Sequence, residues 1–401
     1  MSAPFAIAGV VPRDVVTPHG VEELARTVRE LYENGKAFAF LGGGTHRALG
    51  NAPRALHTVV RTVALDRVLE YAAEDQTITV EAGMTLAELD RVLAEHRQML
   101  PLDVADREHA TVGGVVATNV FGRRRQRYGT VKDHIVGVTI VRPDGTPARG
   151  GGRVVKNVAG FDLPKLMTGS LGTLGAIVSA TFRVHPIADA RASAVLAFDD
   201  ANGAARAAQA LVDARLDPES VAVYNGNALA VSFAGTAGGV AAQLRTLVEQ
   251  VASRSGAADV RELVDDEPES YDQRERAVRR DGDWRFRIDA PPASRGWAIR
   301  PDVPSPPLAV PVAYPLLGVA FHAHAAAGMT STADPWNALR ERVSRETGAN
   351  GRVVIEAMPD EARATTDAWG PPPSSLRLMR ALKEAFDPRG LCNAGRFVGG
   401  L

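Results

Sequence analysis

Three consecutive glycines, Gly42, Gly43 and Gly44, follow an apolar segment at residues 36–41 that we interpret as a short strand. Glycine has no Cβ and adopts positive φ angles freely, so the backbone N–H groups of such a loop can approach an anion closely. A diphosphate group would suit this loop. A flexible turn without a ligand fits the three residues equally well, so the triplet alone does not decide between the two.

Two further glycine-rich segments lie downstream. Residues 110–122 are small, apolar and uncharged, and can either lie along a flat ligand or form a tightly packed buried turn. Residues 169–175 contain three glycines and precede a predicted strand at residues 176–184. Three such segments favour a shared ligand over three unrelated turns. The first loop lacks the G-x-G-x-x-G spacing of dinucleotide-binding loops, and no G-x-x-x-x-G-K-[ST] loop is present, which argues against both of those classes.

Three side chains are candidates for a general base by their chemistry alone, namely His322, His324 and Tyr128. On a strand, His322 and His324 would face the same side, as metal ligands do, but no third ligand is evident and we expect no metal site. Tyr128 closes a segment, residues 123–128, that contains four arginines. A carboxylate-binding site, a docking surface for a partner subunit and a solvated turn each fit this cluster.

The elements that would position these residues mix helices and strands without a regular βαβ order, which favours an α+β fold. The apolar spacing predicts a first helix at residues 18–34, capped by Thr17 and Pro18, and Thr85 opens a second helix with a capping-box sequence. Strands are predicted at residues 36–41, 77–81, 135–141 and 176–184.

The pattern changes after about residue 190. Strand, helix, two strands and helix are predicted at residues 193–198, 204–214, 221–224, 229–233 and 240–251. That order resembles half of a ferredoxin-like sheet. Residues 265–283 are polar and predict a solvated connection or an exposed helix, and a last helix begins near Ser374 and ends before Pro388.

Length and composition restrict the remaining classes. A chain of 401 residues predicts two domains, and 46 Lys and Arg against 47 Asp and Glu leave no net charge to attract nucleic acid or an anionic membrane surface. The single cysteine, Cys392, excludes an internal disulfide and an iron–sulfur cluster held by this chain alone. The N-terminus does not resemble a secretory signal, so we expect a cytoplasmic protein.

The uncharged run at residues 303–333 is long enough to span a bilayer. Five prolines interrupt this run, and His322 and His324 lie within it. We therefore expect a buried strand with proline-rich approaches here, and no integral membrane span.

The order of the motifs resembles the FAD-binding domain of the vanillyl-alcohol-oxidase (PCMH-type) superfamily and, within it, the family of glycolate oxidase FAD-binding subunits, GlcE. The segments that carry the likeness are residues 42–46, 98–103, 110–119, 127–138, 155–177 and 386–393. The resemblance implies an α+β chain in three parts. These are a PCMH-type two-subdomain FAD-binding domain at residues 1–188, a smaller ferredoxin-like α+β cap domain at residues 189–373, and a C-terminal segment at residues 374–401 that returns to the flavin.

The resemblance also assigns residues to parts of FAD. It places Gly42, Gly43, Gly44, Thr45 and His46 in the first pyrophosphate loop, Thr111, Gly113, Gly114, Thr118 and Gly122 in the second, Gly172, Gly175, Ile177 and Val178 at the adenine and ribose end, and Asn393 near the flavin ring. Lys156 and Asn157 are further candidates for ordering a loop near the flavin, while Asp162 can instead cap the helix begun by Pro164. Some members bond the flavin to a histidine directly after a glycine pair. Here Thr45 holds that place, which predicts non-covalent FAD.

The function implied by the resemblance is oxidation of a 2-hydroxy acid such as glycolate to the 2-oxo acid, by hydride transfer to flavin N5. Since the chain cannot hold a cluster, an iron–sulfur subunit and a homologous flavoprotein subunit are the expected partners. One departure concerns the substrate side: residues 321–328 stand where an H-x-G-D-G-N-x-H segment is expected, and they lack its acid and its asparagine. Two alternatives therefore stay open, a stand-alone FAD-linked oxidase or dehydrogenase of a sugar acid or alcohol, and a non-catalytic FAD-binding subunit.

Overall fold

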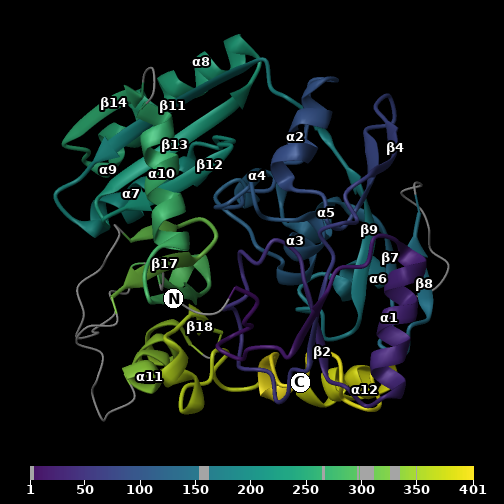
Figure 1. Cartoon of the computed structure of the whole chain (residues 1–401). Helices are drawn as coiled ribbons and strands as arrows, with labels where there is room; N and C mark the ends of the chain where they lie inside the picture. Colours follow the sequence, from purple (N-terminus) through teal and green to yellow (C-terminus); the bar gives the residue numbers. More distant parts are fainter. Residues whose placement is uncertain are drawn as a thin grey trace. The chain divides into compact units, whose positions relative to one another are not determined.

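The computed structural model describes residues 4–152, 162–263, 267–295, 298, 311–325, 335–348 and 350–401 (Figure 1). The chain divides into two compact units. Unit 1 consists of Met1–Phe121, Gly129–Ile187 and Arg363–Leu401, and unit 2 of Gly122–Tyr128 and Ala188–Ala362. Lys156 and Asn157 lie outside the described residues.

Unit 1 begins with a small parallel sheet in which β3 (Thr58–Arg61) lies between β1 (Asp14–Val16) and β2 (Phe38–Leu41). Helix α1 (Val21–Glu33) packs its apolar face in the same core as β2 and β3. The helix starts three residues later than predicted. Thr17 and Pro18 do not cap it, because Gly20 is the extended N-cap residue and the His19 N–H donates to the Glu23 carboxylate at 2.9 Å.

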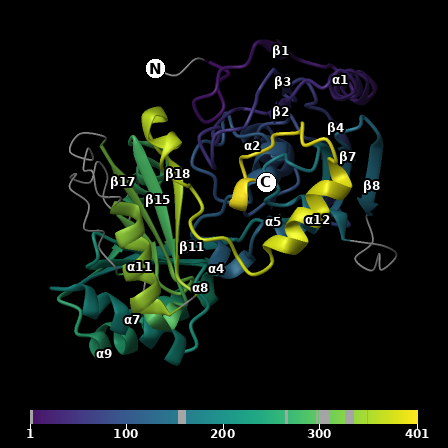
Figure 2. The same ribbon diagram turned by 90° about the horizontal axis from the view of Figure 1, so that it is seen from below.

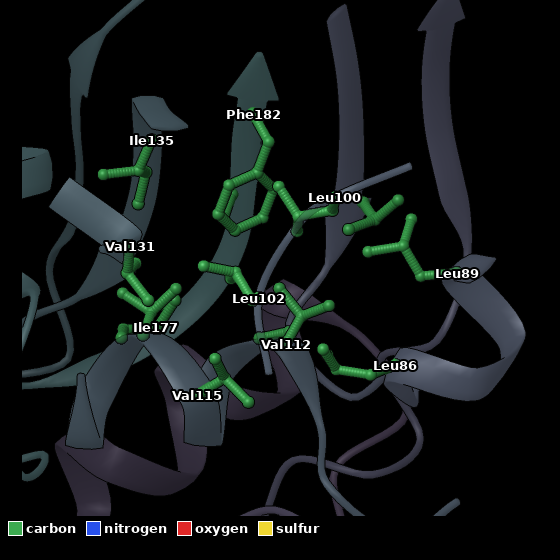
Figure 3. Packing of buried hydrophobic residues seen from close by; sticks show 14 of the residues in the cluster. Leu86, Leu89, Leu100, Leu102, Val112, Val115, Val131, Ile135, Ile177 and Phe182 are labelled. Carbon is green, nitrogen blue, oxygen red and sulfur yellow. The ribbon is translucent and has the colours of Figure 1, made fainter. Parts of the chain in front are cut away.

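Unit 1 also contains an antiparallel sheet of five strands, in the order β4-β5-β9-β7-β8, and a short antiparallel pair of β10 and β6. Its main core gathers apolar side chains of α2, α3 and β9, among them Leu86, Val112 and Phe182 (Figure 3). Helix α2 begins where the capping box predicted, since the Thr85 side chain accepts a hydrogen bond from the Glu88 N–H at 3.2 Å. The elements here are β4 (Val68–Ala72), β5 (Thr77–Glu81), α2 (Leu86–Ala94), β6 (Gln98–Met99), α5 (Val131–His134), β7 (Ile135–Val141), β8 (Pro147–Gly151), α6 (Leu163–Met167), β9 (Ala176–Arg183) and β10 (His185–Pro186).

The second glycine-rich segment forms a short helix, α3 (Val112–Thr118), where the sequence suggested a turn or a stretch lying along a ligand. The Thr111 side chain caps it by accepting a hydrogen bond from the Gly114 N–H at 3.3 Å. Val112, Val115 and Val116 are buried in the main core of unit 1. Burial of this valine face outweighs the poor helix propensity of the adjacent glycines.

The C-terminal segment returns to unit 1. After α12 (Leu376–Phe386), the chain runs beside β2: the Phe38 N–H donates to the carbonyl oxygen of Leu391 at 2.9 Å, and the Asn393 N–H donates to that of Phe38 at 2.7 Å. The buried Lys383 ammonium fixes this return, since it donates to the Asp387 carboxylate at 2.6 Å and to the carbonyl oxygens of Thr173 at 2.7 Å and Cys392 at 2.8 Å. A 3₁₀ turn (Val398–Gly400) ends the chain.

Unit 2 contains one antiparallel sheet of eight strands, in the order β14-β11-β13-β12-β16-β17-β15-β18. Its first four strands and two helices follow the chain order βαββαβ, with the strands arranged fourth, first, third, second. This arrangement is the ferredoxin-like fold expected for this part of the chain. The elements are β11 (Ala190–Ala197), α7 (Ala201–Asp213), β12 (Ser220–Tyr224), β13 (Ala228–Gly235), α8 (Ala237–Thr246) with its continuation η1 (Leu247–Ala252) and α9 (Ser253–Ser255), and β14 (Asp259–Leu263).

The other half of the sheet repeats that spatial order in reverse and joins the first half where β12 pairs with β16, Val223 opposite Ala313. The polar segment at residues 265–283 contains helix α10, which buries Glu275 and Val278. Helix α11 packs beside β18 (Figure 2). The elements are α4 (Arg125–Tyr128), α10 (Glu267–Arg280), β15 (Trp284–Asp289), η2 (Pro292–Ser294), β16 (Val312–Tyr314), β17 (Val319–His324), α11 (Pro335–Thr347), β18 (Arg352–Ala357) and η4 (Asp360–Ala364).

The uncharged run at residues 303–333 is described only at residues 311–325. Within that stretch it forms β16 and β17, and all residues of both strands are buried. In the part of the chain that the structure describes, no helix is both long and apolar enough to cross a membrane.

Candidate functional site

A pocket in unit 1 brings together segments that are far apart in the sequence. About 730 Å³ of space lies between its lining residues, part of it open to solvent. The pocket is lined by Phe40, Leu41, Gly42, Gly43, Gly44, Thr45, His46, Arg47, Thr62, Thr111, Gly113, Gly114, Ala117, Thr118, Leu171, Gly172, Gly175, Ile177 and Arg396.

The structure thus gathers most of the predicted cofactor residues in one place: all five of the first loop, Thr111, Gly113, Gly114 and Thr118 of the second, and Gly172, Gly175 and Ile177 of the third. Gly122, Val178 and Asn393 are not among the lining residues. Gly122 belongs to unit 2, and Val178 is buried in the core beneath α1. Asn393 uses its side-chain amide N–H to bond the carbonyl oxygen of Leu171 at 2.5 Å. Their predicted contacts with FAD stay predictions.

The first and second loops lie against each other backbone to backbone. A Cβ on Gly43 would come within 1.6 Å of the carbonyl oxygen of His109, and one on Gly42 would lie 2.1 Å from the Thr111 hydroxyl. These two glycines are therefore required by the contact between the loops, and not only by the approach of a ligand. Gly44 differs, because its φ of +77° is a left-handed conformation while its nearest neighbouring atom would be 3.9 Å away.

The charged side chains of the pocket are cationic. Arg47 and Arg396 line it, and the ring of His46 is hydrogen-bonded to the Thr45 hydroxyl at 3.0 Å. None of the described residues that line the pocket is acidic. A pocket with a glycine-rich backbone, two arginines and no acidic side chain among its described residues suits an anionic ligand such as a diphosphate.

Arg396 and Thr62 were not predicted from the sequence. Thr62 follows the end of β3, and no local motif marks it. Arg396 lies three residues after Asn393, just beyond the motif at residues 386–393 but within the C-terminal segment, residues 374–401, that the resemblance had assigned to the flavin. The position of that motif beside β2 was therefore the available signal.

The predicted bases His322 and His324 lie on β17 in unit 2. Their same-face placement is as expected, with ring centroids 6.4 Å apart, and both rings are buried and stack on Phe286, at centroid distances of 5.0 and 5.7 Å. Among the described residues no group of three histidines, cysteines or acids could hold a metal ion. This packing is typical of core histidines, and neither side chain lines the pocket of unit 1.

Tyr128 and its neighbouring arginines also belong to unit 2. The Tyr128 hydroxyl donates to the Glu219 carboxylate at 3.4 Å, and burial together with that carboxylate raises the pKa of the tyrosine, which opposes a role as a base. Arg123 pairs with Asp272 and Glu275, Arg124 lies 3.7 Å from Glu219, and Arg127 lies 3.5 Å from Asp217. These ion pairs fix residues 122–128 within unit 2 and favour a structural role for the cluster.

Asp162 takes the capping role that the sequence suggested. Its side chain accepts a hydrogen bond from the Lys165 N–H at 3.3 Å, and Pro164 lies in the first turn of α6. The carboxylate also pairs with the Lys165 ammonium at 2.9 Å.

The fold and the pocket define a flavoprotein. A model of FAD binding domains matches residues 12–151, and a model of the C-terminal domain of FAD linked oxidases matches residues 370–397. Both matches are to domains of FAD-linked oxidases of the PCMH-type superfamily, and they support FAD as the cofactor. The two matched segments contain the first two glycine loops and the C-terminal return beside β2.

Curated relatives match the chain over about half of its length. They include glycolate oxidase subunit GlcD of Bacillus subtilis, 26% identical over 53% of this chain and 45% of that protein. The mitochondrial D-lactate dehydrogenase [cytochrome] 1 of Saccharomyces cerevisiae is 31% identical over 54% and 37%. The D-2-hydroxyglutarate dehydrogenase of Xanthomonas citri pv. viticola is 34% identical over 43% and 37%. Each match therefore spans less than half of the relative.

Solved structures show the same fold over nearly the whole chain. A structure of alkyldihydroxyacetonephosphate synthase superposes with a TM-score of 0.68, at 18% identity, and covers 94% of this chain and 76% of that one. The fold expected from the sequence, a PCMH-type FAD-binding domain combined with an α+β domain, is confirmed.

Proposed function

We propose that this chain oxidises a 2-hydroxy acid, such as glycolate, to the 2-oxo acid as an FAD-linked dehydrogenase or as a subunit of one. The observation that carries the proposal is the common chemistry in the names of its relatives, since glycolate, D-lactate and D-2-hydroxyglutarate are all 2-hydroxy acids. When bound, FAD supplies a hydride acceptor at N5.

The chain's own residues are proposed to bind and orient the cofactor. Gly42–Gly44 of the first loop and Thr111, Gly113 and Gly114 of the second line a pocket with no acidic side chain among its described residues, which suits the diphosphate. Gly172, Gly175 and Ile177 line the same pocket and are assigned to the adenine and ribose end. We propose that FAD is held non-covalently, since Thr45 follows the glycines and His46 instead bonds the Thr45 hydroxyl.

We further propose that an iron–sulfur subunit and a homologous flavoprotein subunit complete the enzyme. One relative is itself named a subunit of glycolate oxidase. The only cysteine of this chain, Cys392, is fully buried, and burial raises the pKa of its thiol to about 12, so it is unsuited to ligating a cluster. Electrons must then leave the flavin to a group held elsewhere.

Anaerobic titration of the purified chain tests the proposal. Glycolate, D-lactate and D-2-hydroxyglutarate are each added to the flavin-loaded protein while its visible spectrum is recorded, with dithionite as the control that reduces any accessible flavin. Bleaching by at least one 2-hydroxy acid is expected. Bleaching only by a sugar acid, lactone or simple alcohol would replace this substrate class with the stand-alone oxidase alternative.

A non-catalytic FAD-binding subunit is the second candidate. The observation that favours it is the burial of His322 and His324 against Phe286, which leaves the segment that departs from the H-x-G-D-G-N-x-H pattern without an evident base. Under this alternative dithionite bleaches the flavin, whereas no organic substrate does, either alone or with the partner subunits present.

A further inference from the structure

Arg396 is a buried cation that lines the pocket. The residue is only 5% exposed. Its Nη2 donates hydrogen bonds to the carbonyl oxygens of Arg47, at 3.0 Å, and of Leu49. The buried Nε has no hydrogen-bond partner, and among the described residues no carboxylate pairs with this guanidinium. The chain therefore satisfies the Nη2 donors, while Nε and Nη1 are left for another acceptor.

A buried guanidinium without an anion is unfavourable, because arginine keeps its charge and loses the stabilisation that water provides. Burial, and then the nearby charge of Arg363, lower the pKa of Arg396 to about 9. Buried charges in proteins are normally paired. The Arg396 guanidinium thus lacks a negatively charged partner among the described residues, and we expect that partner on the side of the pocket.

Lys383, in the same C-terminal segment, is a buried cation whose charge is balanced within the chain. Its ammonium has three acceptors from the chain itself, including the buried Asp387 carboxylate. Nothing further is needed to neutralise Lys383. Since none of the described residues supplies such a partner to Arg396, the contrast favours a bound ligand as its partner.

We propose that Arg396 is the ion partner of the FAD diphosphate. Its hydrogen bonds to Arg47 and Leu49 hold it against the segment that follows the first glycine loop. It lines the same pocket as that loop. The diphosphate carries negative charge in both redox states of the cofactor, and the remaining Nε and Nη1 donors can each bind one of its oxygens. The inference rests on FAD filling this pocket and is independent of which substrate is oxidised.

The test compares Arg396→Gln with the wild-type chain, each freed of flavin and titrated with FAD and, separately, with riboflavin, which lacks the diphosphate. Glutamine keeps one donor for the carbonyl oxygens but removes the charge. The dissociation constant for FAD should rise on the order of 10- to 100-fold, the loss typical of a hydrogen bond to a charged group. That for riboflavin should not change.

Arg389→Gln is the matched control. Arg389 belongs to the same segment and likewise donates to two backbone carbonyl oxygens, those of Tyr32 and Glu33, but it does not line the pocket. This variant should bind FAD like the wild type. Equal FAD affinity in all three proteins would overturn the proposal.

Two further readouts distinguish a charge that faces the diphosphate from one that faces the flavin ring or only supports the fold. If FAD affinity is unchanged but the flavin midpoint potential falls in Arg396→Gln, the charge faces the flavin N1 locus and the assignment to the diphosphate is wrong. Arg396→Lys, which keeps a charge without the fork, should give an intermediate FAD affinity and a normal circular dichroism spectrum. An equal loss of FAD and riboflavin binding in both variants would mean a collapsed pocket, and would also contradict the proposal.

Discussion

The arginines of residues 123–127 in unit 2 and Arg396 in unit 1 lie in opposite electrostatic surroundings. Arg123, Arg124 and Arg127 each have a carboxylate of unit 2 within 4 Å, whereas the partners of Arg396 among the described residues are carbonyl oxygens. The dense cluster, which is conspicuous in the sequence, is neutralised by its own unit. Arg396, one of four arginines in the C-terminal segment, has no carboxylate partner among the described residues, and it lines the pocket of unit 1. We therefore expect an anion to bind where a buried arginine lacks a carboxylate partner, and not where arginines are most numerous in the sequence.

The largest effect is expected for the buried cation that is already paired. In Lys383→Met, the buried Asp387 carboxylate loses its counter-ion and the carbonyl oxygens of Thr173 and Cys392 lose their donor. Breaking a buried pair in this way should lower the free energy of unfolding by about 3–5 kcal/mol. Chemical denaturation monitored by circular dichroism measures this change.

Lys165→Met is the control for Lys383→Met, because Lys165 also pairs with an aspartate, Asp162 at 2.9 Å, but at the surface. An exposed pair contributes little, so the unfolding curve should barely move. Similar losses in the two variants would show that burial of the Lys383 pair is not what matters.

The contact between the two glycine loops gives the second prediction. In Gly43→Ala, the new methyl group meets the carbonyl oxygen of His109, which it can avoid only if the loops separate. We expect a loss of about 1–3 kcal/mol in unfolding free energy, as for other overpacked sites, together with loss of FAD retention during purification. A bulkier residue such as valine should have the same effect, only larger.

Gly44→Ala provides the comparison for the loop. Its Cβ meets no close neighbour, so only the left-handed backbone is strained, at a cost of about 1–2 kcal/mol. The loops should stay in contact and the protein should still purify with flavin. Retention of FAD by Gly43→Ala at normal occupancy would mean that the loop contact does not control the pocket.

Arg123→Met tests the other side of the comparison. The substitution leaves Asp272 and the buried Glu275 without one of their cationic partners, and should reduce stability by about 1–3 kcal/mol. Because the arginine is neutralised within unit 2, the dissociation constant for FAD should not change. A loss of FAD affinity as large as that of Arg396→Gln would remove the distinction between the two kinds of arginine.

The sequence predicted local structure well where the signal comes from neighbouring residues. The glycine loop at Gly42–Gly44 follows a strand, and Thr85 caps a helix, as expected. Helix α3 was missed because Gly113 and Gly114 disfavour helix, while the burial that stabilises it depends on contacts distant in sequence. The order of the strands in unit 2 was suggested only for its first half.

Charge neutralisation is the part that the sequence could not supply. Asp272 lies 149 residues after Arg123, and Glu219 lies 91 residues after Tyr128, so neither partner is evident from a local motif. Arg396 was missed because no described carboxylate pairs with it. Such a missing partner becomes visible only in the folded chain.

Tyr128→Phe has the smallest expected effect and addresses chemistry directly. The pKa of Tyr128 is raised by burial and by Glu219, so the hydroxyl stays protonated at neutral pH and cannot accept a proton. Removing it deletes one long hydrogen bond of 3.4 Å, for a loss of at most about 1 kcal/mol in stability. The pH profile of flavin reduction by a reactive 2-hydroxy acid should superimpose on that of the wild type. If one limb of the pH profile disappears instead, Tyr128 takes part in proton transfer. Residues 122–128 would then have a catalytic role in addition to their structural role in unit 2.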